Sequence, residues 1–108
     1  MSDFARTREA YHQTLNAVMN EQALDALVFP QMLETPPPLR GDGRIRTTTV
    51  HEINIAGFPG VIVPAGYHAN GVPFCLIFVG RPWAEAQLLS FAFDYEQATR
   101  YRHTPNLM

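Results

Sequence analysis

Six consecutive apolar residues at positions 74–79, Phe-Cys-Leu-Ile-Phe-Val, constrain the fold of this chain more than any other part of its sequence. Aromatic and β-branched residues are typical of a strand. A strand with one face in water alternates apolar and polar side chains, whereas this continuous run predicts that both faces are covered. The chain therefore needs packed structure on two sides of a sheet.

Two further apolar runs supply the other predicted strands. Residues 60–64 are rich in valine and isoleucine, and the following Asn70-Gly71 tolerates the positive φ of a tight turn, which predicts a hairpin with residues 74–79. Residues Ala26–Pro30 form a short apolar run closed by a proline, which predicts a buried strand. With so few strands, we expect a small sheet with exposed edges.

Helical patterns lie on either side of these runs. From about residue 4 to residue 20 the apolar positions share one face of a helix, and Asp3 is its expected N-cap. Residues 84–101 predict a second long helix. Its apolar residues cover more than half of the circumference, so this helix should pack on two sides.

A short helix is predicted at residues 50–56, in the middle of the chain. Thr49 and Glu52 have the spacing of a capping box, and Gly57 is expected to end the helix. Residues 31–47 contain three successive prolines and a Gly-Asp-Gly turn, so they should form a loop. The elements together predict a single α/β domain over residues 1–108, in which helices cover a small, mainly hairpin-built sheet.

The charges and the lengths of the apolar runs exclude several partners. All eight basic residues are arginines, they are scattered, and the net charge is -2, so no face for nucleic acid is predicted. The apolar runs are too short to cross a bilayer and the N-terminus is polar, from which we expect a cytoplasmic protein without membrane contact. One cysteine and four histidines without zinc-type spacing predict no disulfide, metal site or cofactor.

Few side chains in this sequence can act as nucleophiles. The sequence has no lysine, and its only serines are Ser2 near the terminus and Ser90 within a predicted helix. A serine nucleophile activated by a lysine is therefore excluded. Cys75 with His51 or His68 and a carboxylate could form a cysteine site, but a cysteine inside an apolar strand is more often a small core residue.

Several short motifs follow one another in the second half of the chain. They are Asn54-x-x-Gly57-x-Pro59, Val63-Pro64-x-Gly66, Gly71-x-Pro73, Val79-Gly80-Arg81 and a helix with Leu88-Leu89 and Glu96. In this order they resemble the C-terminal end of amidase-signature enzymes. The upstream Asp25-Ala-Leu-Val-Phe-Pro30 looks like the strand that precedes these motifs in that family, so the resemblance runs from about residue 8 to Pro105.

The resemblance implies a fold and a reaction. Such enzymes hydrolyse amides through a serine, a second serine and a lysine, which lie upstream of the matching segment and have no counterpart here. The segment before the asparagine helps to line the substrate cleft in the family, which makes Thr48, Thr49 and Asn54 the candidate cleft residues. Cys75 and Ile77 stand where the family usually has glycine and glutamine, a local departure from the pattern.

These observations predict a fragment of the amidase-signature fold that hydrolyses nothing alone and acts as a structural or partner-binding module. The alternative is one chain of a split amidase, in which a separate chain supplies the nucleophile. A different catalyst built on Cys75 is the third reading. The wide apolar surface of the last helix and the open sheet edges predict a homo-oligomer or a complex with a complementary amidase chain.

Overall fold

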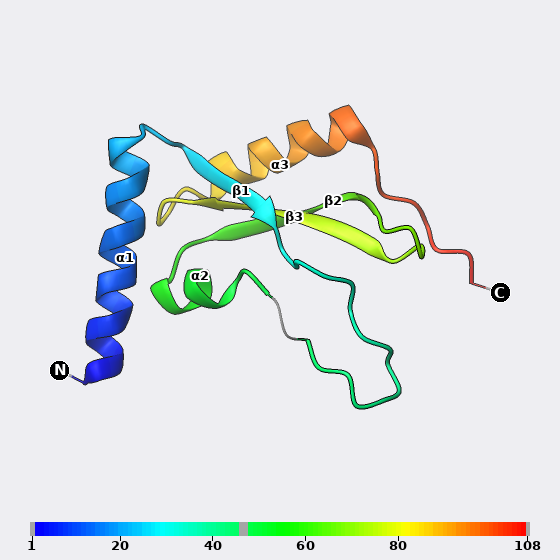
Figure 1. Cartoon of the computed structure of the whole chain (residues 1–108). Coiled ribbons are helices and arrows are strands. Elements are labelled where there is room, and N and C mark those ends of the chain that lie inside the picture. Colours follow the sequence, from blue (N-terminus) through cyan, green and yellow to red (C-terminus); the bar gives the residue numbers. More distant parts are fainter. Residues whose placement is uncertain (1, 46–47, 108) are drawn as a thin grey trace.

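The structure, a computed structural model, describes residues 2–45 and 48–107 and places three helices and three strands in them (Figure 1). In chain order they are α1 (Asp3–Glu21), β1 (Ala26–Pro30), α2 (His51–Ala56), β2 (Gly60–Tyr67), β3 (Pro73–Gly80) and α3 (Glu85–Thr99). The strands form one antiparallel sheet in the order β1-β3-β2. This architecture confirms the predicted α/β fold with a small sheet built mainly on a hairpin.

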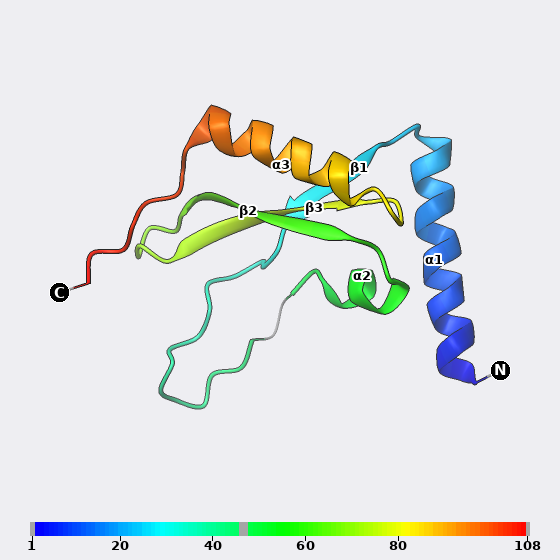
Figure 2. The same cartoon turned by 180° about the vertical axis from the view of Figure 1, so that it is seen from behind.

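The central strand β3 is covered on both faces, as its continuous apolar sequence predicts. Successive side chains of a strand point to opposite faces. Figures 1 and 2 show α3 on one side of the sheet and α2 on the other, with α1 standing at the end of the sheet. The core with α1 and α2 contains Met19, Ile53, Ala56, Phe58, Ile77 and Val79. The core with α3 contains Val63, Phe78, Leu88 and Ala92.

The turn between β2 and β3 lies where Asn70-Gly71 predicts it. The His68 N–H donates to the Val72 carbonyl (2.8 Å), and the Gly71 N–H donates to the His68 carbonyl (2.9 Å). Asn70 Oδ1 accepts the Val72 N–H (3.2 Å), and Gly71 has a φ of 84°, which glycine adopts without a steric cost. The predicted hairpin is confirmed, and both strands are longer than the apolar runs that predict them.

Strand β1 has the predicted bounds, but the prediction that it is buried is wrong on one face. Val28 is 50% exposed. The reason is the position of β1 in the sheet, because it is an outer strand and α3 packs on β2 and β3. Leu27 and Phe29, on the opposite face, do pack against the core beneath α1 and α2.

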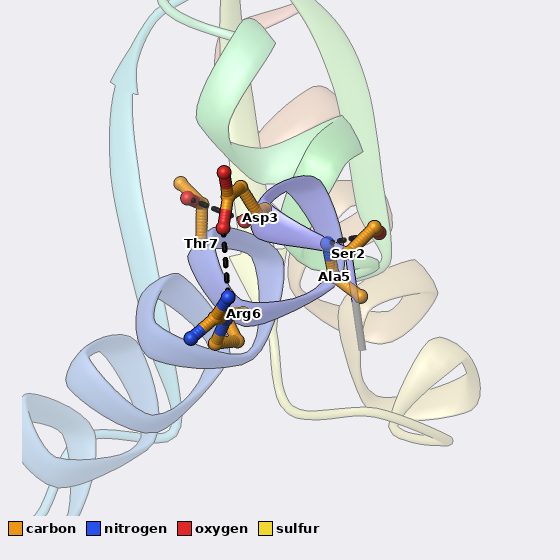
Figure 3. A network of polar contacts seen from close by, with 5 residues as sticks. All are labelled: Ser2, Asp3, Ala5, Arg6 and Thr7. Atoms are coloured by element: carbon orange, nitrogen blue, oxygen red, sulfur yellow. Dashed lines mark hydrogen bonds and ion pairs between the residues drawn. The ribbon is translucent and has the colours of Figure 1, made fainter.

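Helix α1 is capped by a different residue from the one predicted. Ser2 has extended backbone angles (φ -66°, ψ 156°), and its Oγ accepts the Ala5 N–H at 3.3 Å (Figure 3). Asp3, the expected N-cap, is instead the first helical residue: its carboxylate accepts from Arg6 at 2.8 Å and its carbonyl accepts from the Thr7 hydroxyl at 3.0 Å. The helix begins one residue earlier because a serine is available there to satisfy an N–H of the first turn.

Helix α2 lacks the predicted capping box. Val50 occupies the N-cap position and makes no side-chain cap hydrogen bond. The Thr49 hydroxyl donates to the Pro30 carbonyl at 2.6 Å instead, because the loop returns along the end of β1. The predicted C-terminus is confirmed, since Gly57 ends the helix with a φ of 78°.

Residues 31–45 contain no helix or strand element, and an isolated bridge between Met32 and Thr48 lies at the base of this loop. The arms of the loop touch, because a Cβ on Gly43 would lie 2.5 Å from the Pro37 Cβ. Positions 46 and 47, which the sequence also assigns to the loop, lie outside the described residues.

Helix α3 is slightly shorter than predicted and packs with one side only. Leu88 is 0% exposed and sits so close to Gly80 that a Cβ there would lie 2.8 Å from Leu88 Cδ2. Leu89 and Phe93 are 59% and 60% exposed. The prediction that α3 packs on two sides is therefore not met within residues 2–45 and 48–107, where the side with Leu89 and Phe93 stays exposed.

The chain exposes more surface than a compact monomer of its size. Its accessible surface is 8048 Å², against about 6,000 Å² expected for this mass. Its radius of gyration is 16.3 Å, against about 13 Å for a compact domain of this length. The helices and the loop are thus spread around a sheet too small to bury them. None of the described helices is long and apolar enough to cross a membrane.

Candidate functional site

The candidate cleft residues Thr48 and Thr49 lie where the loop returns to the sheet. The Thr49 N–H donates to the Gln31 carbonyl (3.1 Å), and Thr49 Oγ1 lies 2.6 Å from the Pro30 carbonyl and 2.9 Å from the Gln31 carbonyl. A hydroxyl has a single hydrogen, which these carbonyls share. The hydroxyl hydrogen of Thr49 is therefore shared by backbone carbonyls at the end of β1.

Thr48 is also committed to the backbone, whereas Asn54 is exposed. Thr48 Oγ1 accepts the Val50 N–H at 3.2 Å, and its backbone forms the bridge to Met32. Asn54 lies one turn further on, with its side chain exposed on α2. The structure brings Thr48 and Thr49 together as a joint between loop and sheet and leaves Asn54 accessible to a ligand.

A small hollow adjoins this joint and contains the candidate cysteine. It encloses about 40 Å³, whereas small-molecule sites usually enclose ~300–1,000 Å³. Cys75 is partly buried in its wall, and His68, also on the wall, packs its ring edge-on against Phe74 at 5.6 Å between centroids. His51, the other candidate partner of the cysteine, starts α2. The hollow has room for water and not for an amide substrate.

A wider hollow of roughly 400 Å³, which no sequence motif predicts, opens between α1, the end of α2 and the turn from β3 to α3. Arg8 Nε donates to the Ile55 carbonyl (3.0 Å), and His12 Nδ1 lies 3.1 Å from the Ala56 carbonyl. A carbonyl only accepts, so this contact is a hydrogen bond in the tautomer with hydrogen on Nδ1. Both groups satisfy the carbonyl end of α2 and hold α1 against it. Trp83, 92% exposed with a φ of 69°, lines the same hollow.

A third hollow is an apolar groove of roughly 430 Å³ between β2 and α3. Its lining comprises Val61, Ile62, Val63 and Pro64 of β2 and Leu89, Ala92, Phe93 and Glu96 of α3. Leu89 and Phe93 are more than half exposed, and neither carries a polar group. Such a groove suits the apolar surface of another polypeptide and offers little for chemistry.

Both serines are used within helices. Ser2 caps α1, and Ser90 Oγ donates to the Gln87 carbonyl at 2.8 Å on α3. The sequence contains no lysine. The described part of the chain therefore presents no serine that a lysine could activate.

No family model matches the sequence, but individual proteins do. A subunit of the glutamyl-tRNA(Gln) amidotransferase of Roseobacter denitrificans is 38% identical over 94 residues, which cover 78% of this chain and 18% of that protein. The corresponding subunit from Cereibacter sphaeroides is 45% identical over 98 residues, which cover 90% of this chain and 19% of that protein.

A solved structure agrees with these matches. The native peptide amidase from Stenotrophomonas maltophilia superposes with a TM-score of 0.76 at 32% identity, over 94% of this chain and 21% of its own. The chain thus spans about a fifth of the length of these three proteins. It shares the fold of the peptide amidase over that part.

Proposed function

This chain is homologous to a segment of amidase-signature proteins, as its motifs predict, and from that premise we propose that it is a non-catalytic unit of the amidase fold that binds another polypeptide. One observation carries the proposal: the sequence has no lysine, and both of its serines are used within helices. The chain by itself should hydrolyse neither amides nor esters by a serine mechanism.

The uncovered apolar surface supports the binding role. The groove between β2 and α3 is open to solvent, and Leu89 and Phe93 project beside it. Exposed apolar patches that are rimmed by polar residues are typical of interaction sites. Glu96 is part of the rim of this groove.

The test of the non-catalytic role is an assay of the pure chain on activated amides and esters. We expect no steady turnover. Hydrolysis that survives Cys75→Ala would contradict the proposal, because it would need a nucleophile that the sequence does not otherwise suggest. Hydrolysis abolished by Cys75→Ala would contradict it as well and would favour the cysteine reading, in which Cys75 attacks beside His68.

The alternative is one chain of a split amidase. It is favoured by the relatives named as subunits. In that arrangement another chain supplies the serine and the lysine, and we propose that Thr48, Thr49 and Asn54 form one wall of the cleft. Of these, Asn54 is the residue with an exposed side chain.

A complementation experiment separates these functions. The peptide amidase of Stenotrophomonas maltophilia would be produced without the segment that superposes on this chain, and this chain would be added. Recovery of amide hydrolysis supports the split amidase, in which Asn54→Ala should raise KM while Gln13→Ala, an exposed change on α1, should not. Binding without activity supports the non-catalytic unit. A chain that binds neither the truncated amidase nor a second copy would contradict the binding role.

A further inference from the structure

The hydrogen bonds of β2 determine which of its backbone groups face outward. The Gly80 N–H donates to the Pro59 carbonyl at 3.1 Å, so residue 59 faces β3, and residues 61 and 63 do the same by the alternation of an antiparallel strand. The residues between them point their N–H and C=O groups away from the sheet. Between residues 60 and 64 of β2, before the irregularity at Pro64 and Gly66, these outward residues are Gly60, Ile62 and Pro64.

The outer edge of β2 is open at residues 60–64, whereas Thr49 covers the Pro30 end of the β1 edge. Along residues 2–45 and 48–107 no strand pairs with it, and its donors are the N–H groups of Gly60 and Ile62, because Pro64 has none. On β1 the Gln31 N–H donates to the Cys75 carbonyl, so Pro30 is an outward residue. Its carbonyl already accepts the Thr49 hydroxyl. Ala26 and Val28 of β1 also point outward, and the feature that distinguishes the β2 edge is the apolar groove that runs along it.

We propose that a second copy of this chain pairs with β2 in antiparallel fashion about a twofold axis at Ile62, an inference that rests on the proposed binding function and names its partner. Each Ile62 N–H donates to the partner's Ile62 carbonyl. Each Gly60 N–H donates to the partner's Pro64 carbonyl. This register uses every outward N–H between residues 60 and 64, and the missing N–H of Pro64 leaves a Gly60 carbonyl to water.

The same axis aligns the two α3 helices. A twofold axis perpendicular to the sheet keeps both helices on one face and makes them antiparallel, so Leu89 and Phe93 of both copies close the groove. Glu85 lies one turn before Leu89, and Arg100 lies one turn after Glu96, so both extend the stripe that faces the axis. The Glu85 end of one stripe meets the end of the other that carries Glu96 and Arg100. The apolar middle of each stripe, Leu89 and Phe93, meets the same residues of the other copy, which favours a second copy as the occupant.

A dimer would cover part of the large surface that the chain as a whole exposes. The chain exposes about 2,000 Å² more than a compact monomer of its mass, and a standard interface takes about 800 Å² from each partner. Ile62 contributes to this surface with 46% exposure. Residues 60–64 carry no charge, so two copies of the strand meet without repulsion.

Hydrogen exchange on the wild-type chain at rising concentration tests the register directly. The Ile62 amide should become protected as light scattering reports dimers, because its N–H then has an acceptor. The Val28 amide, which faces outward from β1, should exchange at an unchanged rate and serves as the internal control. A monomer at high micromolar concentration, or a dimer in which the Ile62 amide stays unprotected, would overturn the proposal.

Matched variants test the edge and the groove. Ile62→Pro removes an outward donor and leaves the hydrogen bonds to β3 intact, so it should raise the dimer Kd about tenfold or more, whereas Val28→Pro on β1 should not. Phe93→Asp adds a charge to the groove at an exposed helical position, where folding is unaffected, and should weaken the dimer as well. Equal Kd values for the wild type, Ile62→Pro and Phe93→Asp would overturn the dimer described.

The outcomes separate this inference from the proposed function. A chain that stays monomeric but binds the truncated amidase would overturn the inference and leave the proposed function standing. A chain that dimerises through β2 but hydrolyses amides on its own would overturn the proposed function and leave the inference standing.

Discussion

The edges of the two outer strands of the sheet share one feature, an outward-facing proline, and differ in what lies beside it. Each carries a proline whose missing N–H faces outward, Pro30 on β1 and Pro64 on β2. Proline at such positions weakens unwanted pairing with other strands. On β1 the outward carbonyl of Pro30 accepts the Thr49 hydroxyl at 2.6 Å, whereas the β2 edge borders an apolar groove. A residue distant in the sequence therefore closes the Pro30 end of one edge, and no such contact covers residues 60–64 of the other.

The largest effect should come from removing the side chain that holds α3 over the β2 side of the sheet. Leu88 is 0% exposed, so Leu88→Ala should lower the free energy of unfolding by about 3–5 kcal/mol through lost burial and a cavity. The matched change Leu89→Ala, one residue along and 59% exposed, should cost less than about 0.5 kcal/mol at concentrations where the chain is monomeric. Urea unfolding measures both, and equal losses would contradict the one-sided packing of α3.

Opening the closed edge should have the next largest effect. Thr49→Val keeps the shape of the side chain but leaves the Pro30 carbonyl without its donor, which should cost about 2 kcal/mol in the free energy of unfolding. Thr14→Val, which loses only an exposed bond to the Ala10 carbonyl within α1, is the control and should cost much less. If the two variants were equally stable, the Thr49 hydroxyl would not be what closes the edge.

Restoring a donor to the β2 edge should tighten the dimer. Pro64→Ala returns an outward N–H opposite the partner's Gly60 carbonyl, and the added hydrogen bonds should lower the dimer Kd about tenfold. Pro30→Ala adds the same donor to β1, where no dimer contact is proposed, and should leave the Kd unchanged. Sedimentation of both variants checks this, and tighter dimers from Pro30→Ala would point to the wrong edge.

The smallest effect concerns the thiol that lies beside the closed edge. Cys75 is partly buried in the hollow at the Thr49 joint, so thiol reagents should label it slowly in the native chain and quickly after unfolding in urea. Thr49→Val should speed native labelling, because local opening of the joint becomes less costly. Native labelling as fast as in urea would show that this wall of the hollow is not covered.

Much of the fold could be predicted because its signals are local. The helix stop at Gly57, the turn at Asn70-Gly71 and the strand Ala26–Pro30 each depend on the backbone preferences of a few neighbouring residues. The errors arose where several local partners compete. Ser2 and Asp3 are both good N-caps, and only the register of the first turn chooses between them.

The candidate site was less predictable. Thr49 has the right spacing for a capping box, yet its hydroxyl goes to Pro30, which is 19 residues away in the sequence. The groove beside β2 has no sequence motif, because it results from α3 covering the inner part of the sheet and leaving Leu89 and Phe93 outside. The pattern of the helix did show too many apolar positions for one core face, which is the signal of an uncovered surface.

By itself the sequence determined the elements, the hairpin, the two-faced burial of β3 and the absence of a serine–lysine pair, because these depend on residue identity and on spacing along the chain. The folded structure was needed to see that β1 and β2 are the outer strands, that Thr49 covers the Pro30 end of one edge, and that the other edge borders a groove. The physical reason is that an edge is defined by what lies beside it. Which groups of a strand find partners depends on segments far apart in the sequence, and those contacts exist only after the chain has folded.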